Sequence, residues 1–315
     1  MMGPVSVLVG IDIGGSGLRL QAARDGAAGG VRTAPGVRIT PEGIDLDALV
    51  ASAEGLLAAE ATPGQRSGID VLVWSMRGLL GLSDPRSVLD TVAARLRAEV
   101  TAVCSDALSS LVGAVGEVRP GAVVAAGTGA VAFGTDFAQV WRRVDGWGHV
   151  LGDRGSGAWV GLEGLRAALL EHDGVSTAGS ALLDVATDHF GPPALWPRLV
   201  MTRTDAPALL AGFAPVVTRL APTDAAAADI CSAAGRALAA SLAAAARGVT
   251  GAVVSATGGL LEADPVRRAF EDDCRERQLV PVPAAGTSLD GALTLAGHLH
   301  AGRPLGSRPP YLLLR

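Results

Sequence analysis

Two glycine-rich segments each follow a continuous apolar run. GGSG (14–17) comes after the run 5–13, and GTG (127–129) interrupts GAVVAAGTGAVAFGTD (121–136). Because glycine has no Cβ atom, successive backbone N–H groups of such a segment can approach an anion closely. A plain turn is the alternative for each segment taken alone. Two such loops at matching places favour phosphate binding more strongly than either does by itself.

Two aspartates stand next to predicted strands. Asp12 lies at the end of the first apolar run, where an ionised carboxylate is costly unless it is paired or lies beside a metal ion. A solvated Asp in a hairpin is the alternative. Asp106 lies between a predicted strand and a predicted helix. Its carboxylate can accept backbone N–H bonds as an N-cap, which its position alone favours, or act as a general base.

The glycine-dense segment GWGHVLGDRGSG (146–157) carries a large aromatic side chain, Trp147, in a chain that is only 3 % aromatic. An aromatic ring in such a loop more often packs against the apolar face of a ligand than stands there by chance. Asp153 and Arg154 come just before a predicted helix start. A flexible loop with a cap at Ser156 is the alternative.

The apolar patterns predict an alternation of strands and helices. Strands are predicted at 5–13, 18–23, 69–74, 100–104, 139–144 and 279–283, twice within 121–136, and within 251–261, where a glycine pair that could be a simple turn follows. Helices are predicted at 45–60, 84–98, after 100–104 with an apolar face from Leu108 to Val115, through Leu162 to Leu169, through the region 178–247, from 264 onward and at 288–302. Thr287 and Asp290 form a capping box for the last helix.

Strands mixed with crossover helices predict an α/β fold with at least partly parallel sheets. The opening of strand, glycine turn and strand occurs twice and predicts two similar lobes, at residues 1–118 and 119–315. The last helix, 288–302, could pack back on the first lobe. A cleft is expected between the lobes.

The composition excludes several classes of protein. All 26 basic residues are Arg, because the chain contains no Lys, and Asn is absent as well. A Walker A loop and Schiff-base or pyridoxal chemistry both need a Lys, so both are excluded. The net charge is −5 and no Arg stripe is present, so nucleic acid is not an expected partner. With 49 % hydrophobic residues, the chain is expected to be globular rather than disordered.

The three cysteines, Cys104, Cys231 and Cys274, are widely separated and lack CxxC spacing. This argues against disulfide scaffolds, zinc ribbons and iron–sulfur clusters, and it fits a reducing cytosol. The most apolar long stretch, 232–261, is interrupted by two arginines, so no membrane span is expected. No basic segment precedes the first apolar run, so no signal peptide is expected either. The sequence therefore predicts a cytoplasmic protein.

Five segments carry, in order, a resemblance to a known family. They are GIDIGGS (10–16), SDA (105–107), AAGTGA (125–130), GWGHVLGDRGSGAWVG (146–161) and ATGGL (256–260). Together they resemble the BadF/BadG/BcrA/BcrD-type ATPases and N-acetylglucosamine kinases of the actin/hexokinase/Hsp70 superfamily. The resemblance implies two ribonuclease-H-like lobes that clamp ATP, Mg²⁺ and a sugar in an interdomain cleft. It implies transfer of a phosphoryl group to the 6-hydroxyl of an amino sugar, for which N-acetylglucosamine and glucosamine are the first candidates. It also implies a homodimer.

The resemblance also implies roles for particular residues. Asp106 would be the general base, and Asp12 would lie next to the metal ion. The phosphates of ATP would lie against Asp12, Gly14, Gly15, Ser16, Gly127, Thr128 and Gly129, and the adenosine against Gly258, Gly259 and Leu260. The sugar would contact Gly78, Ser105, Asp106, Gly146, Trp147, Asp153 and Arg154.

Four positions depart from the pattern of the family. Ser105 stands where relatives commonly have Asn, Arg154 where they have Glu, Ala130 where they have Ser, and Gly17 where a Lys is often found. Arg154 reverses a charge near the expected sugar site, which favours a neutral N-acetyl group or an acidic substituent over a protonated amine. Two other functions stay open. One is an ATPase that activates a 2-hydroxyacyl-CoA dehydratase-type enzyme through an iron–sulfur cluster, and the other is a sugar or nucleotide sensor without turnover.

Overall fold

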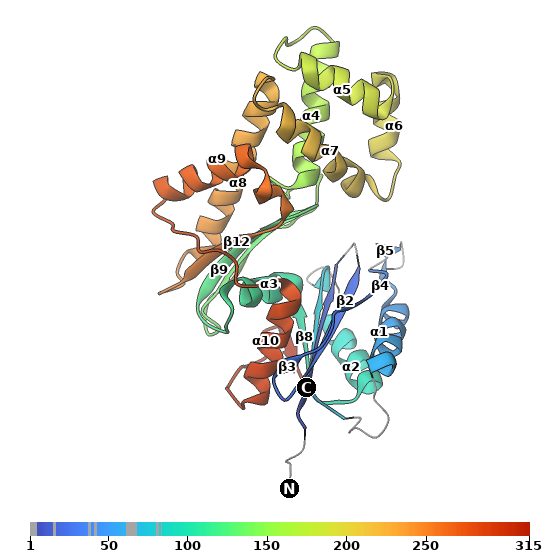
Figure 1. The fold of residues 1–315 in the computed structure, drawn as a ribbon, viewed down its shortest axis with the longest axis vertical. Coiled ribbons are helices and arrows are strands. Elements are labelled where there is room, and N and C mark those ends of the chain that lie inside the picture. The colour runs from blue at the N-terminus through green and yellow to red at the C-terminus, as the bar shows by residue number, and fades with distance from the viewer. Residues whose placement is uncertain are drawn as a thin grey trace. The chain divides into compact units, whose positions relative to one another are not determined.

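The computed structural model describes residues 5–14, 17–36, 39–40, 43–60, 68–79, 82 and 84–315. The chain divides into two compact units (Figure 1). The first unit contains Met1–Pro120, Asp136–Trp141 and Pro283–Arg315, and the second contains Gly121–Thr135 and Arg142–Val282. The sequence predicts a break after residue 118. In the structure, the second unit begins at Gly121, and the last segment of the chain belongs to the first unit.

In the described part of the chain, the first unit is built on one seven-stranded sheet. Its strands lie in the order β13, β8, β7, β1, β2, β3, and β4 also pairs with β2. The bounds are β1 Val7–Ile13, β2 Leu18–Arg24, β3 Ala27–Ala28, β4 Arg32–Ala34, β7 Ile69–Met76, β8 Ala98–Ser105 and β13 Leu312–Leu314, with a separate pair of β5 Ile39–Thr40 and β6 Gly43–Ile44. Strands β1, β7 and β8 run parallel, whereas β2 returns antiparallel beside β1.

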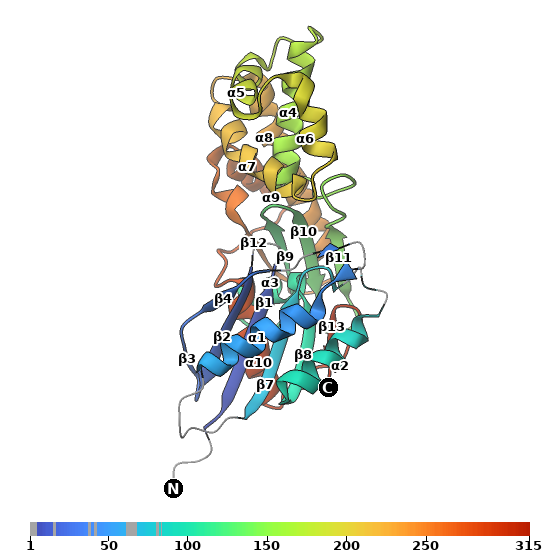
Figure 2. The ribbon, with the colours of Figure 1, turned by 90° about the vertical axis from the view of Figure 1, so that its right-hand side faces the viewer.

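Helices cover both faces of this sheet. Helices α1 Leu46–Glu60 and α2 Pro85–Leu96 lie on one face, and α3 Asp106–Val115 and α10 Ser288–His300 lie on the other (Figures 1 and 2). Strands β1 and β7 are apolar at most of their positions, as is typical of strands that are covered on both sides. The capping box predicted at Thr287 and Asp290 is confirmed at the start of α10.

Helices α3 and α10 approach each other at backbone distance. A Cβ atom added to Gly113 would lie 1.9 Å from the carbonyl O of Thr287, and one added to Gly291 would lie 1.9 Å from the carbonyl O of Ser109. Only glycine fits at these two positions, because any side chain would hold the helices apart. Since α10 also packs on β1 and β7, segments from both ends of the chain build the core of the first unit.

The second unit holds a four-stranded sheet with the order β11, β10, β9, β12. Its strands are β9 Gly121–Ala126, β10 Ala130–Thr135, β11 Trp141–Asp145 and β12 Val253–Thr257. Its helices are α4 Gly157–His172, α5 Ser180–Phe190, α6 Trp196–Met201, α7 Ala206–Leu220, α8 Ala225–Ala246 and α9 Asp264–Glu276, with short 3₁₀ turns at Pro193–Leu195 and Gly259–Glu262. None of the described helices combines the length and the apolar character needed to cross a membrane.

One strand prediction is wrong and several short strands are not predicted from the sequence, although the α/β class is confirmed. The strand predicted at 279–283 is wrong, because in the described structure only Val282 forms a bridge, with Ser255. Pro281 and Pro283 flank Val282, and proline lacks the N–H group that a strand ladder needs. Strand β13 is not predicted from the sequence, because three residues at a sheet edge show neither alternation nor a long apolar run.

Candidate functional site

Asp12 and Asp106 lie at the same edge of the sheet of the first unit. The parallel strands β1, β7 and β8 end at that edge, and their register aligns Asp12 with Ser75 and Ser75 with Cys104. Asp106 follows Ser105, the last residue of β8, and is the first residue of α3. Open α/β sheets bind ligands at the carboxyl ends of their parallel strands. The structure therefore brings both predicted carboxylates to the edge of the sheet at which folds of this class bind ligands.

Asp12 is buried and paired with an arginine. It is 3 % exposed, and its Oδ2 accepts a hydrogen bond from Nη2 of Arg19, its register partner on β2. The Arg19 side chain is 46 % exposed, so it reaches from the surface to the buried carboxylate. Burial makes such a partner necessary. The sequence alone does not single out Arg19, although a hairpin that pairs Ile13 with Leu18 must also pair Asp12 with Arg19.

Ser105, and not Asp106, caps helix α3. The Oγ of Ser105 accepts the N–H of Leu108 at 3.3 Å, and Ser105 is buried. Asp106 occupies the first helical position, where its Oδ1 accepts the N–H of Ala107 at 2.9 Å. The N-cap interpretation of Asp106 is therefore wrong. A partly exposed carboxylate at this position is also stabilised by the positive end of the helix dipole.

Two buried serine side chains form hydrogen bonds next to this edge. The Oγ atoms of Ser75 and Ser109 are 2.6 Å apart, and Ser109 Oγ donates to the carbonyl O of Asp106 at 3.0 Å. Burial raises the pKa of the Cys104 thiol, a hydrogen bond with Ser75 opposes this rise, and the charges of Asp12 and Asp106 add to it. Cys104 therefore stays a neutral packing residue and is not a nucleophile.

The described part of the first glycine loop is tight. The N–H of Gly14 donates to the carbonyl O of Gly17 at 3.0 Å. A Cβ atom on Gly36 would lie 2.4 Å from the carbonyl O of Gly14, so the segment that follows β4 packs directly on the loop. The predicted phosphate-binding residues Gly15–Ser16 lie outside the described residues. Gly78, predicted for the sugar site, follows β7 with a φ of +83°, a conformation that favours glycine.

The second glycine loop joins β9 to β10 and lies against the start of α4. The N–H of Gly127 donates to the carbonyl O of Gly129 at 2.9 Å, and Gly127 and Thr128 are exposed. The first N–H groups of α4 bind this loop. Gly157 donates to the carbonyl O of Gly127 at 2.8 Å, and Ala158 donates to that of Thr128 at 3.1 Å. The loop is thus attached to the helix while its tip faces solvent.

The glycine pair after β12 adjoins this second loop. Gly258 has a φ of +109°, and a Cβ atom there would lie 2.2 Å from the carbonyl O of Ala126, the residue before Gly127. Gly259 is exposed, whereas Leu260 is buried in the core of the second unit. The structure therefore brings the predicted adenosine glycines next to the predicted phosphate loop within one unit.

The predicted sugar residues of the second unit form one loop between β11 and α4. Trp147 is 66 % exposed, and the guanidinium carbon of Arg143 lies 4.4 Å from the centre of its ring. Gly146 precedes it with a φ of +76°. Asp153, in contrast, is buried, and its Oδ1 accepts the N–H of Gly148 at 2.9 Å. The ring therefore faces solvent, while the carboxylate is directed into the loop.

Asp145 is a further residue of this loop that the sequence alone does not single out. It is buried, and its carboxylate accepts the N–H groups of Asp153 and Arg154 at 2.6 and 2.9 Å. The exposed side chain of Arg154 pairs with it, with 3.8 Å between Nε and Oδ2. Asp145 therefore partly balances the charge that Arg154 brings to the loop. The Asp-Gly pair at 145–146 marks a turn, but no sequence pattern shows which N–H groups the carboxylate binds.

The described residues fit a magnesium ion that is held mainly by a nucleotide. Within the described ranges, no three His, Cys, Asp or Glu side chains gather as a metal cluster. Mg²⁺ commonly takes one or two carboxylates together with phosphate oxygens and water. Asp12 supplies one buried carboxylate next to the first glycine loop, and one is enough for such a site.

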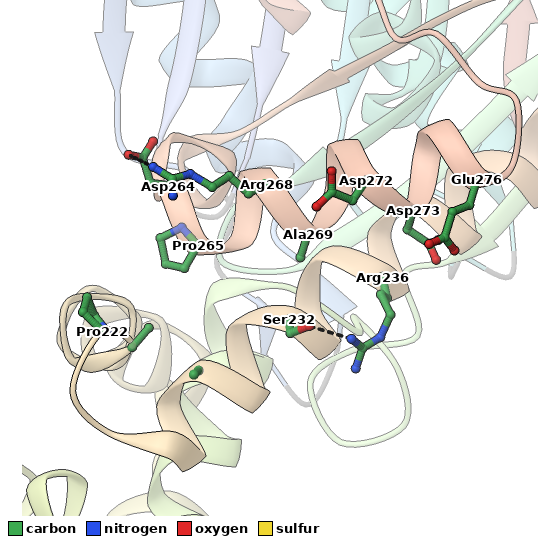
Figure 3. Close-up of a pocket in the computed structure, with 12 residues that line it drawn as sticks. Pro222, Ser232, Arg236, Asp264, Pro265, Arg268, Ala269, Asp272, Asp273 and Glu276 are labelled. Carbon is green, nitrogen blue, oxygen red and sulfur yellow. Dashed lines mark hydrogen bonds and ion pairs between the residues drawn. The ribbon is translucent and has the colours of Figure 1, made fainter.

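A cavity of about 660 Å³ lies between α8 and α9 of the second unit (Figure 3). Its lining carries charges of both signs, and they are partly satisfied locally. Arg236 donates to Ser232 at 2.5 Å, and Arg268 pairs with Asp264 at 3.5 Å. Among the described residues, none of those predicted for the site lines this cavity. The cavity is therefore separate from the glycine loops and the carboxylates described above.

Solved structures confirm the fold. A candidate N-acetylglucosamine kinase from Chromobacterium violaceum aligns with a TM-score of 0.71 and 25 % identity over 93 % of this chain and 99 % of that chain. A candidate N-acetylglucosamine kinase from Porphyromonas gingivalis aligns with a TM-score of 0.71 and 17 % identity over 95 % and 100 %. A ROK family glucokinase from Streptomyces griseus aligns with a TM-score of 0.55 and 18 % identity over 93 % and 100 %. The predicted α/β fold of the actin/hexokinase type is confirmed.

Sequence comparison leads to the family. An N-acetylmuramic acid/N-acetylglucosamine kinase from Clostridium acetobutylicum is 39 % identical over 71 residues. This match spans 22 % of the present chain and 23 % of the length of that curated relative. The sequence model of the BadF/BadG/BcrA/BcrD ATPase family matches residues 9–286, which contain all five segments that carry the resemblance. The chain belongs to the BadF/BadG/BcrA/BcrD ATPase family.

Proposed function

We propose that this protein is an ATP-dependent kinase that transfers a phosphoryl group to the 6-hydroxyl of an amino sugar, with N-acetylglucosamine ahead of glucosamine. The observation that carries the proposal is the placement of Asp106. It stands partly exposed at the carboxyl end of β8, at the edge that also holds Asp12, and Ser105 rather than Asp106 caps the helix that follows. The likeness to the candidate N-acetylglucosamine kinase from Chromobacterium violaceum over 93 % of the chain supports it.

Phosphoryl transfer depends on positioning and on neutralisation of charge rather than on covalent help from the protein. Asp106 accepts the proton of the sugar hydroxyl as the oxygen–phosphorus bond forms, and ADP leaves with the electron pair of the broken bond. Asp12 would hold a magnesium ion, which would supply charge neutralisation on the phosphates.

The phosphates must be held without a lysine. The exposed tip of the second glycine loop offers backbone N–H groups and the hydroxyl of Thr128. In the first unit, Arg19 brings a guanidinium to the carboxylate of Asp12, at the strand end where the first glycine loop begins. Because a guanidinium has five donors in a fixed geometry that matches phosphate, we assign Arg19 the cationic role that lysine has in other kinases.

The sugar is placed against Trp147. Its exposed ring offers an apolar face to the C–H side of a pyranose, while Arg143 covers the ring from another side. The exposed guanidinium of Arg154 suits an acidic substituent on the sugar. The named substrates of the Clostridium acetobutylicum relative include such a sugar, N-acetylmuramic acid, which therefore belongs in the substrate panel.

The burial of the cysteines favours a kinase over an activator that carries an iron–sulfur cluster between chains. Such a cluster needs thiolates that two chains can share at a surface. Cys104, Cys231 and Cys274 are all buried, and burial raises the pKa of Cys231 and of Cys274 to about 11. Protein purified without oxygen is therefore expected to hold no iron, and a stoichiometric brown cluster would favour the activator.

A coupled assay of ADP release tests the proposal. The panel consists of N-acetylglucosamine, glucosamine, N-acetylmuramic acid, N-acetylmannosamine and glucose, each with Mg²⁺ and ATP. We expect the highest kcat/KM with an N-acetylated amino sugar and a 6-phosphate product in the phosphorus NMR spectrum. Sugar binding without ADP release would identify a sensor. Failure of every sugar either to bind or to stimulate ADP release would contradict the proposal.

A further inference from the structure

We propose that Asp145 is a positioning residue whose buried carboxylate holds the loop 146–155 in the shape that presents Trp147 to the sugar. The link to sugar binding rests on the proposed function. The ordering of the loop does not, and it can be measured separately. Neither the sequence pattern nor the family resemblance assigns a role to Asp145.

The carboxylate of Asp145 binds two backbone N–H groups on the far side of the loop. Its Oδ1 accepts the N–H of Asp153 at 2.6 Å and its Oδ2 accepts that of Arg154 at 2.9 Å, eight and nine residues further along the chain. Asp145 is only 8 % exposed, so these charge-assisted bonds are shielded from water. One side chain thus closes the base of the loop.

A second carboxylate holds the loop in the opposite direction. Oδ1 of Asp153 accepts the N–H of Gly148 at 2.9 Å, and the N–H of Gly152 donates to the carbonyl O of Gly148 at 2.8 Å. Asp145 therefore binds forward along the chain, and Asp153 binds backward. We call this arrangement the Asp145–Asp153 clasp. It explains how a loop with an exposed apolar tip keeps a defined shape, since Leu151 is 85 % exposed and adds little packing.

Trp147 is held by groups that contact Asp145. Gly152 lies between Asp145 and Trp147. A Cβ atom on Gly152 would lie 2.3 Å from Oδ1 of Asp145 and 2.9 Å from Cβ of Trp147. Arg143 covers the indole ring and donates through Nε to the carbonyl O of Asp145 at 3.0 Å and through Nη2 to that of Gly146. The ring is therefore exposed but restrained. An aromatic platform that is already ordered loses little conformational entropy when a ligand stacks on it.

The backbone conformation indicates that aspartate is present at positions 145 and 153 because of its carboxylate. Asp145 has a φ of +60° and Asp153 a φ of +53°, both in the left-handed region that favours glycine. If only the turn mattered, glycine would serve better at position 145. Aspartate at this position keeps the two hydrogen bonds at the expense of a less favourable backbone. Asp145→Gly therefore removes the carboxylate without straining the turn.

The end of the loop is attached independently of Asp145. The N–H of Ser156 donates to the carbonyl O of Asp153 at 3.0 Å, and its Oγ caps α4 by accepting the N–H of Trp159 at 3.0 Å. Helix α4 also binds the second glycine loop through Gly157 and Ala158. Loss of the clasp should therefore free residues 146–155 and leave the phosphate loop in place. An effect on sugar binding can therefore be distinguished from an effect on ATP binding.

Hydrogen exchange of the unliganded protein tests the ordering of the loop. Asp145→Asn places an amide NH₂ group against one of two N–H donors, and Asp145→Gly removes both acceptors. In both variants we expect exchange at the amides of Gly148, Asp153 and Arg154 to become about tenfold faster, while the hairpin 121–135 is unchanged. Gly152→Ala keeps Asp145 but drives a methyl group into its Oδ1, and it is expected to have the same effect.

Asp136→Asn is the matched control. Oδ1 of Asp136 also organises a turn, because it accepts the N–H groups of Ala138, Gln139 and Val140 at 2.9, 2.9 and 2.8 Å. That turn belongs to the first unit. This variant should speed exchange at residues 138–140 and leave the loop 146–155 as it is in the wild type.

Steady-state kinetics tests the consequence for the sugar. We expect the KM for the sugar to rise about tenfold in both Asp145 variants, whereas kcat and the KM for ATP change less than about twofold. The Asp136 control should change none of the three. Such a split separates a positioning role from a general loss of folded protein, which would lower the apparent kcat in every assay.

Each outcome decides the proposal. Unchanged loop exchange in both Asp145 variants overturns the positioning role, and so does faster exchange spread over the whole second unit. Faster loop exchange with an unchanged KM for the sugar overturns the link to Trp147. If the wild type neither binds nor phosphorylates any sugar, the proposed function fails. The exchange experiment still shows in that case whether the clasp orders the loop.

Discussion

Arg19 and Asp12 face each other across strands β1 and β2, and the guanidinium of Arg19 binds the buried carboxylate of Asp12. The carboxylate that we propose as the magnesium ligand is therefore already paired with a cation of the chain itself. A metal ion at Asp12 must share the carboxylate with Arg19 or displace it. Arg19 also brings a guanidinium to the strand end where the first glycine loop begins, and in a chain without lysine such a cationic group must come from arginine, histidine or a metal ion.

Replacing Arg19 should expose this competition. Arg19→Gln leaves Asp12 buried without its cation, and we expect a loss of about 1–2 kcal/mol in the free energy of unfolding, because Arg19 is only half buried. Millimolar Mg²⁺ should raise the Tm of this variant more than that of the wild type. Arg24→Gln is the control, because Arg24 lies on the same strand opposite the apolar Val7. An equal response to Mg²⁺ in all three proteins would show that Arg19 and the metal ion do not compete.

The second prediction separates the base from the cap at the start of α3. Because Ser105 supplies the cap, Asp106→Asn should change the free energy of unfolding by less than about 0.5 kcal/mol, while kcat falls about 100-fold or more. Asp84→Ala is the converse control. Asp84 caps α2 by accepting N–H groups at 3.0 and 3.3 Å, so its loss should cost about 1 kcal/mol of stability with activity retained. Full activity in Asp106→Asn would remove Asp106 from the mechanism.

The third prediction concerns the close contact between Gly258 and Ala126. Gly258→Ala would combine a positive φ with a Cβ atom 2.2 Å from a carbonyl oxygen, so the strand end must shift. We expect a loss of more than about 2 kcal/mol and a higher KM for ATP. Gly251→Ala is matched, because Gly251 has a φ of +69° but nothing within 4 Å, and it should lose only about 1 kcal/mol. Equal losses in the two variants would show that the contact is unimportant.

The fourth prediction is a pH dependence of stability. Burial lowers the pKa of His298 below its usual value, the charge of Arg303 adds to this, and Nε2 of His298 lies buried without a hydrogen-bond partner in the described structure. The native state therefore binds a proton less readily than the unfolded chain. The stability that this histidine contributes is complete above the pKa of the unfolded state and is lost as the pH falls towards the lowered native pKa.

Thermal unfolding between about pH 7.5 and about pH 5 measures this effect. The decrease in Tm on acidification should be smaller in His298→Gln than in the wild type. His300→Gln, on the same helix at an exposed position, is the control and should behave like the wild type. A decrease of the same size in all three proteins would assign the acid sensitivity to other groups.

Local patterns account for what the sequence could predict. The capping box at Thr287 and Asp290 depends on bonds within four residues, so it can be read directly from the chain. The clasp at Asp145 could not be predicted, because its hydrogen bonds span eight and nine residues and depend on a positive φ. The pair of Asp12 and Arg19 lies between these cases. It follows from the register of one hairpin, but only burial shows that the pair is needed.

Other differences arise where two residues suit the same role. Serine and aspartate are nearly equal as N-caps, so the pair Ser105 and Asp106 could not be resolved from the sequence. The backbone places Ser105 in the extended conformation that a cap requires, with a φ of −70° and a ψ of 147°. The apolar pattern at 279–283 is typical of a strand, but two prolines reduce it to a single bridge. In each case a backbone property, rather than side-chain polarity, decides the outcome.

The packing of α10 on α3 through Gly113 and Gly291 has a consequence for the order in which the chain folds during synthesis. The ribosome releases β1 and β7 early, but the helix that covers them, and strand β13 beside β8, emerge only after the whole second unit. Until then α3 covers only part of that apolar face of the nascent sheet, so the strands that α10 later covers can bind chaperones. The second unit comes almost entirely from one stretch of chain and can close first. The first unit is then completed last, when α10 packs on β1 and β7 and β13 pairs with β8.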